Sequence, residues 1–315
     1  MSENQWDVVV IGGGSAGLSA ALTLVRARRR VLVLDAGLPR NRFAAHMHGV
    51  LGHDGKSPLA LLADGRAEIE SYGGVIREAT VVRTSRDGRG FTVVDGDGHP
   101  VRARRLIVAT GMRDELPDIE GLADCWGRGV AVCPYCDGYE VRDGRIGVLA
   151  TNAMSVQYAH LLRQWSPSIV FFTAVTGAPS DADRAELAAR GIEFEADPVR
   201  RVVADEDRLR GVEMSDGRLI ELDAIFLHPH AVPLDEPLRQ LGAERTETPA
   251  GSFVAVDPSG RTSVAGAWAI GNTANPAANV AVSIGSGVVA AGALNYDLIL
   301  EDIQDAVAAV DEGAA

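Results

Sequence analysis

The sequence predicts an α/β protein made of two Rossmann-like domains of the dinucleotide-binding type. Three observations support this prediction: a strand–helix–strand unit opens the chain, a similar unit lies in its middle, and 315 residues are enough for two domains. We expect the domain segments 1–115, 116–240 and 241–315. The last segment is expected to fold back onto the first, which makes the first domain discontinuous.

The expected elements follow from the apolar pattern along the chain. Short apolar or alternating runs predict strands, and longer runs with helical spacing predict helices. In chain order we expect a strand at 6–11, a helix at 18–28, a strand at 31–34, an antiparallel meander at 80–94, strands at 106–109 and 146–150, a helix at 155–164, a strand at 169–173, a helix at 181–190, strands at 224–227 and 267–270, and a helix at 280–300. The acidic tail at 305–315 is expected to fray.

A glycine-rich loop stands between the first strand and the first helix, with the pattern Gly12-x-Gly14-x-x-Gly17. The first glycine permits a tight turn, the second lets the backbone approach a pyrophosphate, and the third lets helix and strand pack closely. Asp35 ends the next strand, about 20 residues further on, where a carboxylate accepts hydrogen bonds from a ribose diol. We therefore predict a dinucleotide site. The alternative is a glycine turn in an α/β core, with Asp35 at this place by chance.

Composition and charge argue against several other classes. The formal net charge is −13, and no basic stripe is present that would bind nucleic acid. The first residues contain no basic stretch ahead of an apolar run, so we expect no leader peptide. No segment reaches the uninterrupted apolar length of a membrane span, so we expect no membrane association. The chain has only three cysteines, which indicates a reducing, cytoplasmic compartment.

The motif Cys133-x-x-Cys136-Asp137 carries the predicted chemistry. Two cysteines at this spacing can form a readily reduced disulfide, and a thiolate at a helix N-terminus is activated because its pKa falls. Asp137 can move a proton to or from a departing thiol if burial raises its pKa. The alternative is a zinc site, which needs two more ligands, and only Cys125 is left among the cysteines. We expect no metal, and we expect Cys125 to be a buried, small apolar residue.

In order and spacing, these motifs resemble the low-molecular-weight thioredoxin reductase family. The resemblance rests on the glycine loop, Asp35, the segment Ala109-Thr110-Gly111 and the cysteine motif, and it covers nearly the whole chain. It implies FAD in the discontinuous domain, a central domain of pyridine-nucleotide type, and a homodimer. It also implies that the dithiol exchanges electrons with the flavin.

The resemblance assigns roles residue by residue. Cys136 would face the flavin, Cys133 would exchange with the substrate, and Asp137 would be the acid/base. The C-terminal helix at 280–300 would direct its positive end at the flavin. The residues expected to bind FAD are Gly12, Gly14, Ser15, Ala16, Gly17, Asp35, Ala36, Arg40, Asn41, Thr110, Gly111, Gly271, Asn272, Asn279 and Val280.

The central domain departs from this family where NADPH would bind. The strand at 146–150 runs into residues 151–155, which contain no glycine pattern, so side chains occupy the space of a pyrophosphate. The strand at 169–173 is followed by no arginine cluster for a 2′-phosphate. Leu227-His228-Pro229-His230 replaces the glycine turn that would lie against the nicotinamide. We therefore expect that this domain does not use NADPH.

A flavoprotein with a dithiol and no NADPH site needs another source of electrons. A substrate dithiol would attack the Cys133–Cys136 disulfide, and oxygen would reoxidise the flavin. In this respect the chain resembles the FAD-dependent dithiol oxidases of the gliotoxin and holomycin type, which often carry a histidine at the position of Asp137. One alternative is a reductase of thioredoxin or of a small disulfide, fed by NADPH or another donor. The other is a redox-sensing flavoprotein without turnover.

Two further departures lie in the expected flavin site. Asn272 stands where the family has an aspartate for the ribityl chain, and an amide can bind a hydroxyl without charge. The family's Arg-Gln-Ala is absent or altered around residues 278–280.

Five histidines stand near the expected sites. His46, His48 and His53 lie in a segment that runs along the flavin in relatives, and one of them could take a thiol proton. The alternative for each is a hydrogen-bonded loop histidine. His228 and His230 could face the altered nucleotide pocket or the solvent.

Overall fold

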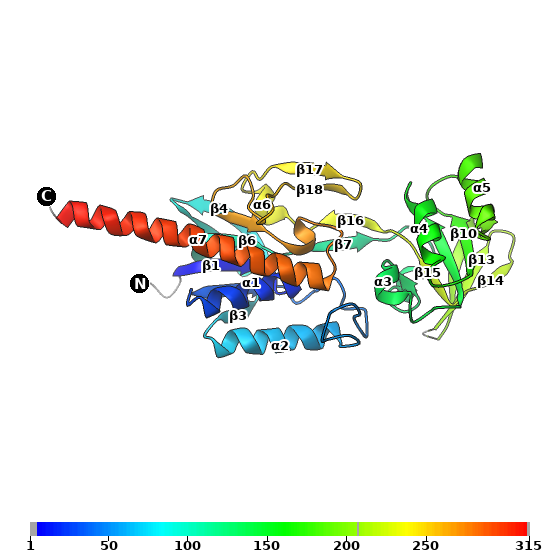
Figure 1. Ribbon diagram of the computed structural model, residues 1–315, viewed down its shortest axis with the longest axis horizontal. Helices are drawn as coiled ribbons and strands as arrows, with labels where there is room; N and C mark the ends of the chain where they lie inside the picture. The colour runs from blue at the N-terminus through cyan, green and yellow to red at the C-terminus, as the bar shows by residue number, and fades with distance from the viewer. Residues whose placement is uncertain (1–4, 207, 314–315) are drawn as a thin grey trace. The chain divides into compact units, whose positions relative to one another are not determined.

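The structure is a computed structural model that describes residues 5–206 and 208–313 (Figure 1). The expectation of no leader peptide rests in part on residues 1–4. These residues lie outside the described residues, as do residues 314–315 of the tail. The chain divides into two compact units. The first comprises Met1–Arg42, Pro58–Arg113 and Ala231–Ala315, and the second comprises Phe43–Ser57 and Asp114–His230.

This division differs from the expected segments at two main places, besides residues 114–115, which group with the second unit. Residues 231–240 group with the first unit, and residues 43–57 group with the second. The main crossing points are two short strands, β7 (Met112–Glu115) and β16 (His230–Pro233), which pair with each other. Residues 43–57 group with the second unit because Phe43 packs closely on Gly127.

The first unit is built on a mixed β-sheet. Its elements are β1 (Gln5–Ile11), α1 (Ser15–Arg26), β2 (Val31–Asp35), α2 (Pro58–Ser71), β3 (Val75–Glu78), β4 (Val81–Asp87), β5 (Gly90–Asp95), β6 (Pro100–Val108), α6 (Glu236–Arg239), β17 (Arg245–Thr248), β18 (Gly251–Val254), β19 (Ala267–Ala269), η2 (Gly271–Thr273) and α7 (Val280–Gly313). The strand order is β3-β2-β1-β6-β5-β4, and β19 pairs in parallel with β6. β1 runs parallel to both of its neighbours, because residues 8–11 are apolar and can be buried on both faces of the sheet.

The long helix α7 packs along α1 in the core of the first unit and continues past the sheet (Figure 1). The expectation that the tail frays is wrong up to Gly313, because residues 305–313 continue the helix. The expectation that no segment has the length and apolarity of a membrane span is also wrong, since Val280–Asp311 meets both criteria. A core helix can meet both criteria as well. Here a third of the 18-residue stretch that meets them is buried. Leu294 and Leu298 of this helix belong to the core of the first unit.

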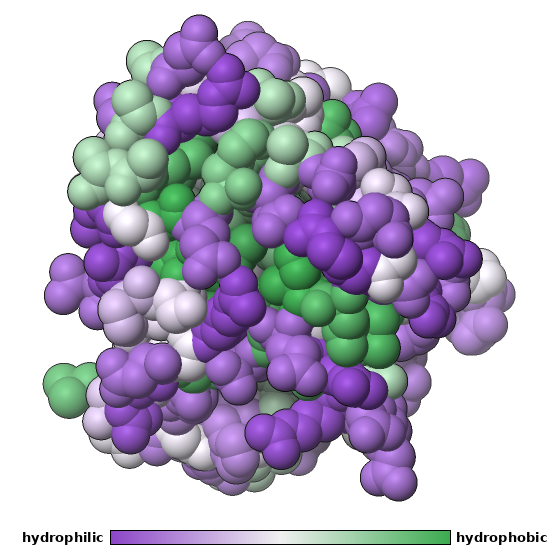
Figure 2. All heavy atoms as spheres, turned by 90° about the vertical axis from the view of Figure 1, so that its right-hand side faces the viewer, coloured by the Kyte–Doolittle hydropathy of each residue, from purple (hydrophilic) through white to green (hydrophobic). Residues whose placement is uncertain are grey.

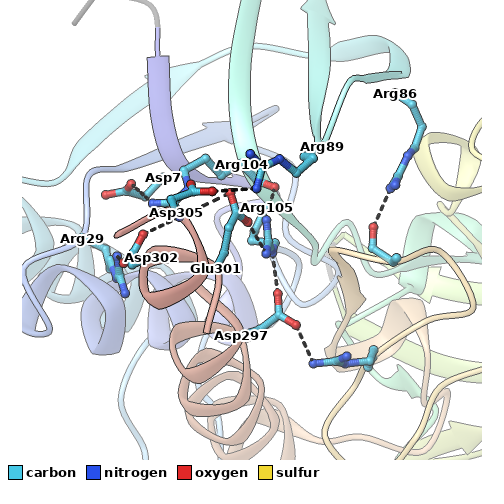
Figure 3. A network of polar contacts seen from close by, with 12 residues as sticks. Asp7, Arg29, Arg86, Arg89, Arg104, Arg105, Asp297, Glu301, Asp302 and Asp305 are labelled. Carbon is cyan, nitrogen blue, oxygen red and sulfur yellow. Dashed lines mark hydrogen bonds and ion pairs between the residues drawn. The ribbon is translucent and has the colours of Figure 1, made fainter. Parts of the chain in front are cut away.

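Ion pairs fasten α7 to the sheet (Figure 3). Arg105 on β6, whose side chain is almost fully buried, binds Asp297 at 2.6 Å and Glu301 at 2.5 Å. Because a buried charge is costly unless it is paired, these carboxylates fix the helix on Arg105. The pairs around them join Arg104 to Asp7, Glu301 and Asp302, Arg29 to Asp302, Arg89 to Asp305, and Arg261 to Asp297.

The second unit is built on a parallel sheet with the strand order β11-β10-β9-β15-β8. Its elements are η1 (Ala123–Cys125), β8 (Val130–Ala131), α3 (Pro134–Asp137), β9 (Arg145–Ala150), α4 (Ser155–Leu162), β10 (Ser168–Thr173), α5 (Asp181–Ala189), β11 (Glu193–Glu195), β12 (Val199–Asp205), β13 (Arg208–Met214), β14 (Leu219–Glu221) and β15 (Ala224–Phe226). β12, β13 and β14 form a separate antiparallel sheet. The buried apolar residues of this unit form two core clusters. The molecular face shown in Figure 2 is mostly hydrophilic.

Candidate functional site

The glycine loop of the first unit is shaped by close backbone contacts. Gly12 has a φ of 106°, and a Cβ there would lie 2.4 Å from the carbonyl oxygen of Ala109. A Cβ at Gly17 would lie 2.0 Å from the carbonyl oxygen of Gly12. Real Cβ atoms do not approach this closely, so both positions require glycine for the loop to pack between β1, α1 and the end of β6.

Gly14 differs from these two glycines. Its backbone is extended, with φ −77° and ψ −177°, and it caps the N-terminus of α1. A Cβ there would have no described heavy atom within 4 Å. Ser15 and Ala16 follow as the first residues of the helix, where backbone N–H groups lack helical partners and attract anions. These residues therefore fit the pyrophosphate of a dinucleotide.

Asp35 lies buried at the end of β2, beside this loop. One carboxylate oxygen accepts a hydrogen bond from the backbone N–H of Gly13 at 2.9 Å, and the other pairs with Arg66. The two contacts hold the carboxylate in one orientation at the edge where a ribose is expected. Ala36 follows as an exposed residue, and Asn41 is partly buried.

Thr110 and Gly111 lie where β6 ends. The Thr110 hydroxyl donates to the carbonyl of Leu234 at 2.6 Å, and the N–H of Gly111 donates to the hydroxyl of Thr273 at 2.7 Å. The N–H of Gly271 donates to the hydroxyl of Ser286 at 3.2 Å. Thr273 and Ser286 were not predicted. Thr273 ties the two chain segments of the discontinuous unit together at this edge, and Ser286 on α7 holds the start of η2.

The contacts of Asn272 explain why an amide stands here in place of the expected aspartate. Its amide nitrogen lies 2.9 to 3.3 Å from the carbonyl oxygens of Asn275, Pro276 and Ala278. A carboxylate could not donate to these oxygens and would repel them. The amide oxygen of Asn272 in turn accepts from Arg40 at 3.5 Å.

The predicted residues Asn279 and Val280 lie at the start of α7. The side-chain oxygen of Asn279 accepts the backbone N–H of Val282 at 2.9 Å and so caps the helix, whose first residue is Val280. Asn272 and Asn279 thus shape the loop that presents the N-terminus of α7.

Cys133 and Cys136 are joined by a disulfide, with 5.2 Å between their Cα atoms. Cys133 caps the short helix α3, and its carbonyl oxygen accepts the N–H groups of Cys136 and Asp137, each at 3.0 Å. Cys125 is free and buried as expected, and burial raises the pKa of its thiol. The cysteines bonded to each other are a redox pair and not a thiolate ligand set.

Asp137 lies in a poorly solvated position at the end of α3. Burial, and next the nearby charge of Glu140, raise its pKa to about 6, and the charge of His48 opposes them. Tyr158 on α4 donates its hydroxyl to the carbonyl of Val132 at 2.6 Å, and burial together with the charge of Asp137 raises its pKa. A carboxyl with a pKa of about 6 can give and take protons near neutral pH.

The loop after β9 is the place where the central domain would hold a dinucleotide. Its backbone N–H groups are bound by side chains of the same loop. The Ser155 hydroxyl accepts from the N–H of Thr151 at 3.1 Å and of Asn152 at 3.3 Å, and the Asn152 side chain accepts from the N–H of Met154 at 2.9 Å. These donors are therefore already used, as the missing glycine pattern suggested.

A side chain of this loop joins the ends of two neighbouring strands. In a parallel sheet a dinucleotide lies at the carboxyl ends of the strands where the strand order reverses, here between β9 and β15. The hydroxyl of Thr151, after β9, donates to the carbonyl of His228, after β15, at 2.6 Å. The ring of His228 packs on Tyr158 with 4.0 Å between the ring centres. Burial lowers the pKa of His228, so the ring favours the neutral form.

Of the other histidines, His46, His48 and His53 occupy loop positions, and His230 begins β16. His46 Nδ1 lies 3.0 Å from the carbonyl oxygen of Gly55, and His53 and His230 are exposed. His48 lies between two carboxylates, a pairing that the sequence did not predict.

The sequence predicts no metal site. The structure brings Asp95, Asp97 and His99 close together, with ligand atoms within 4.8 Å of one another, on the turn after β5. His99 also pairs with Asp95 at 3.5 Å. Two of the three residues are exposed, and acidic turns of this kind are common without a metal, so the cluster supports no metal assignment.

Comparisons with known proteins cover almost the whole chain. Residues 6–313 match the family described as pyridine nucleotide-disulphide oxidoreductase. The chain is 32% identical over 315 residues to thioredoxin reductase sirT of Leptosphaeria maculans, covering 95% of this chain and 96% of that protein. The crystal structure of HlmI is 46% identical with a TM-score of 0.95, covering 100% of this chain and 99% of that one. An oxidoreductase from Agrobacterium tumefaciens is 39% identical with a TM-score of 0.89, covering 94% and 99%.

Proposed function

Since this chain belongs to the pyridine nucleotide-disulphide oxidoreductase family and is an FAD-binding thiol–disulfide oxidoreductase of thioredoxin reductase-like fold, we propose that it oxidises a small-molecule dithiol to a disulfide. We propose oxygen as the electron acceptor and no use of NADPH.

The arrangement of the β9 loop is the observation that supports this proposal. In a nucleotide site the loop N–H groups and the space in front of them serve the pyrophosphate. Here the side chains of Asn152 and Ser155 bind those N–H groups, and the Thr151 hydroxyl donates to the carbonyl of His228. NADPH would have to break these hydrogen bonds before it could bind, whereas the Cys133–Cys136 pair is intact.

In the proposed reaction the residues of this chain carry out thiol–disulfide exchange. A substrate thiolate attacks the sulfur of Cys133, and Cys136 leaves as a thiolate. The second substrate thiol then attacks the substrate sulfur of the mixed disulfide, so the product leaves as a disulfide and the enzyme holds a dithiol. Asp137 exchanges protons with these sulfur atoms. Bound FAD would supply the redox chemistry that returns the dithiol to the disulfide, with oxygen as the proposed final acceptor and hydrogen peroxide as its product.

Anaerobic titration of the FAD-loaded enzyme tests this proposal. We expect dithiothreitol to bleach the flavin absorbance and NADPH to leave it unchanged, and we expect air to restore the colour with release of hydrogen peroxide. Prompt bleaching by NADPH would contradict the proposal and favour a reductase of thioredoxin or of a small disulfide, as the name of the Leptosphaeria relative suggests. If neither compound bleaches the flavin, the protein is a redox sensor without turnover.

A cysteine variant tests the dithiol step. Cys133→Ser should abolish oxidation of dithiothreitol and still retain FAD, since the glycine loop is in the other unit. Cys125→Ala is the matched control, because this cysteine is buried and free of the disulfide. Turnover by Cys133→Ser would rule out the mechanism.

We also propose that the protein is a homodimer joined along α7. Exposed apolar residues repeat on this helix with alternating spacings of four and three, as in a coiled coil, on the side away from the core. They are Tyr296, Leu300, Ile303, Val307 and Val310. A second copy of this helix would cover the stripe. Glu301, Asp302, Asp305 and Asp311 in the same stretch of helix make a lipid partner unfavourable.

Ultracentrifugation tests the dimer. Ile303→Glu should shift the protein from dimer to monomer, whereas Ala309→Glu, on the opposite side of the helix, should not. A parent protein that sediments as a monomer at micromolar concentration would contradict the proposal.

We propose a cytoplasmic location on the basis of cysteine usage. A redox-active pair and a buried free thiol suit a reducing compartment, where stable structural disulfides are rare. Recovery in the soluble cytoplasmic fraction of the producing cells is the expected result, and secretion would contradict it.

A further inference from the structure

His48 is held at both ring nitrogens by carboxylates. Its Nδ1 lies 3.3 Å from Asp54 and its Nε2 lies 3.5 Å from Glu140. Asp54 is itself fixed, because its other oxygen accepts the backbone N–H of Gly49 at 2.9 Å. The His48 side chain is 25% exposed, against 69% for Asp54 and 44% for Glu140, so it is the most buried member of the group.

Glu140 connects this group to the redox pair. It lies three residues after Asp137, directly beyond α3 and the cysteines. The negative charge of Glu140 favours the protonated form of Asp137, and a positive charge on His48 favours the ionised form. Tyr158, on α4, is the other titratable group that interacts with Asp137. The ionisation of Asp137 therefore depends on charged residues from two segments of the second unit, residues 43–57 and the turn after α3.

We propose that His48 is a positioning residue for the cysteine chemistry: it holds the Glu140 carboxylate beside Asp137, balances its charge, and so controls proton exchange between Asp137 and the Cys133–Cys136 pair. The inference rests on the acid/base role in the proposed function. It assigns a task to residues 43–57, which lie between β2 and α2 in sequence and belong to the second unit by contact. His46 and His53 do not share this task, since His46 contacts a backbone carbonyl and His53 is exposed.

The pH dependence of thiol reactivity tests the proposal. The reduced, FAD-loaded enzyme is alkylated with iodoacetamide over a range of pH, and the rate at the cysteine pair is measured by mass spectrometry. His48→Gln removes a positive charge near Asp137 and should move the pH midpoint of the inflection that reports Asp137 upward by roughly half to one pH unit. Glu140→Gln removes a negative charge and should move this midpoint downward by a similar amount. The double variant with His48→Gln and Glu140→Gln should have a midpoint near that of the parent, and His53→Gln should leave the midpoint unchanged.

The outcomes separate this inference from the proposed function. A His48→Gln variant that is slower at every pH with an unchanged midpoint would overturn the inference, because a merely structural role has that effect. Asp137→Asn should remove the inflection near pH 6 that reports the carboxyl of Asp137 and leave the rise that comes from ionisation of the thiol itself. If the inflection near pH 6 persists, the acid/base assignment fails and the inference fails with it. The assay uses neither oxygen nor NADPH, so it does not depend on the electron acceptor. Melting temperature and FAD content show that each variant is folded.

Discussion

Replacing Gly14 with valine should separate FAD binding from the stability of the fold. The backbone of Gly14 is extended, a conformation that valine adopts readily, and a Cβ there would meet open space. The main cost to folding is a poorer N-cap for α1. We therefore expect the free energy of unfolding of the apoprotein to fall by about 1 kcal/mol or less.

The effect on FAD should be larger. A valine side chain would fill the space through which the pyrophosphate must approach the N–H groups of α1. A hydrogen bond to a charged group is worth about 1.5–3 kcal/mol, so losing one weakens binding about ten- to a hundredfold. Titration of apoprotein with FAD, followed by quenching of flavin fluorescence, gives the dissociation constant.

Gly17→Ala is the matched control for this prediction. Its Cβ would lie 2.0 Å from the carbonyl oxygen of Gly12, so the fold itself should suffer, and the apoprotein should unfold at a lower temperature or denaturant concentration. A folded Gly14→Val protein that binds FAD as tightly as the parent would refute our interpretation of the loop. Destabilisation of the Gly14→Val apoprotein as severe as that of Gly17→Ala would show that Gly14 serves the fold instead.

The other predictions concern the acid/base, the α7 ion pairs and the flavin loop. Because the folded pKa of Asp137 is about 6 against an ordinary value of 3.8, the folded protein binds the extra proton, and stability is lost as the pH rises through this window. Asp137→Asn should therefore make the protein more stable than the parent at pH 8. Urea unfolding should show a free energy of unfolding that is higher by up to about 3 kcal/mol, and an unchanged free energy would contradict the burial of this carboxyl. Arg105→Ala leaves Asp297 and Glu301 without their buried partner and should cost about 3 kcal/mol in the same assay, and a neutral result would show that the network adds no stability. Asn272→Asp removes the donor to three carbonyl oxygens and should lower the melting temperature, whereas an unchanged value would show that the amide does not hold the loop.

Much of the fold could be predicted because its central strands are short apolar runs next to glycine loops. β1, β2, β9 and β10 lie within one or two residues of their expected positions. The first helix begins three residues earlier than expected, because the glycine loop leads directly into Ser15, and it ends at Arg26 shortly before Arg28, whose φ is 64°. α2 was not predicted, since few of its residues are buried and its apolar periodicity is weak.

The tail shows where composition misled the prediction. Residues 305–313 are acidic and rich in alanine, which suggested fraying, but alanine is also the best helix former, and here it extends a helix already fixed by its packing. The ion pair between Asp305 and Arg89 adds a contact that joins distant parts of the sequence. No local pattern contains that information.

The candidate site divides in the same way. The glycine loop and the Cys133–Cys136 pair with Asp137 beside it could be predicted because each is a local motif. The pairing of His48 with Glu140 joins residues far apart in the chain and requires the packing of residues 43–57 on the second unit. The hydrogen bonds within the β9 loop had a local signal, because Asn and Ser side chains such as Asn152 and Ser155 readily accept the backbone N–H groups of residues near them in the sequence.

The chain contains its own comparison between a loop that suits an anion and one that does not. Both loops follow a parallel strand and lead into a helix, one after β1 and one after β9. In the first, Gly14 leaves open space in front of the helix, and no described heavy atom comes within 4 Å of its Cβ position. In the second, Asn152 and Ser155 bind the N–H groups that a phosphate would otherwise bind. Because the two loops have the same place in equivalent units, the difference between them lies in the side chains. This difference is our ground for proposing a thiol, and not a pyridine nucleotide, as the source of electrons.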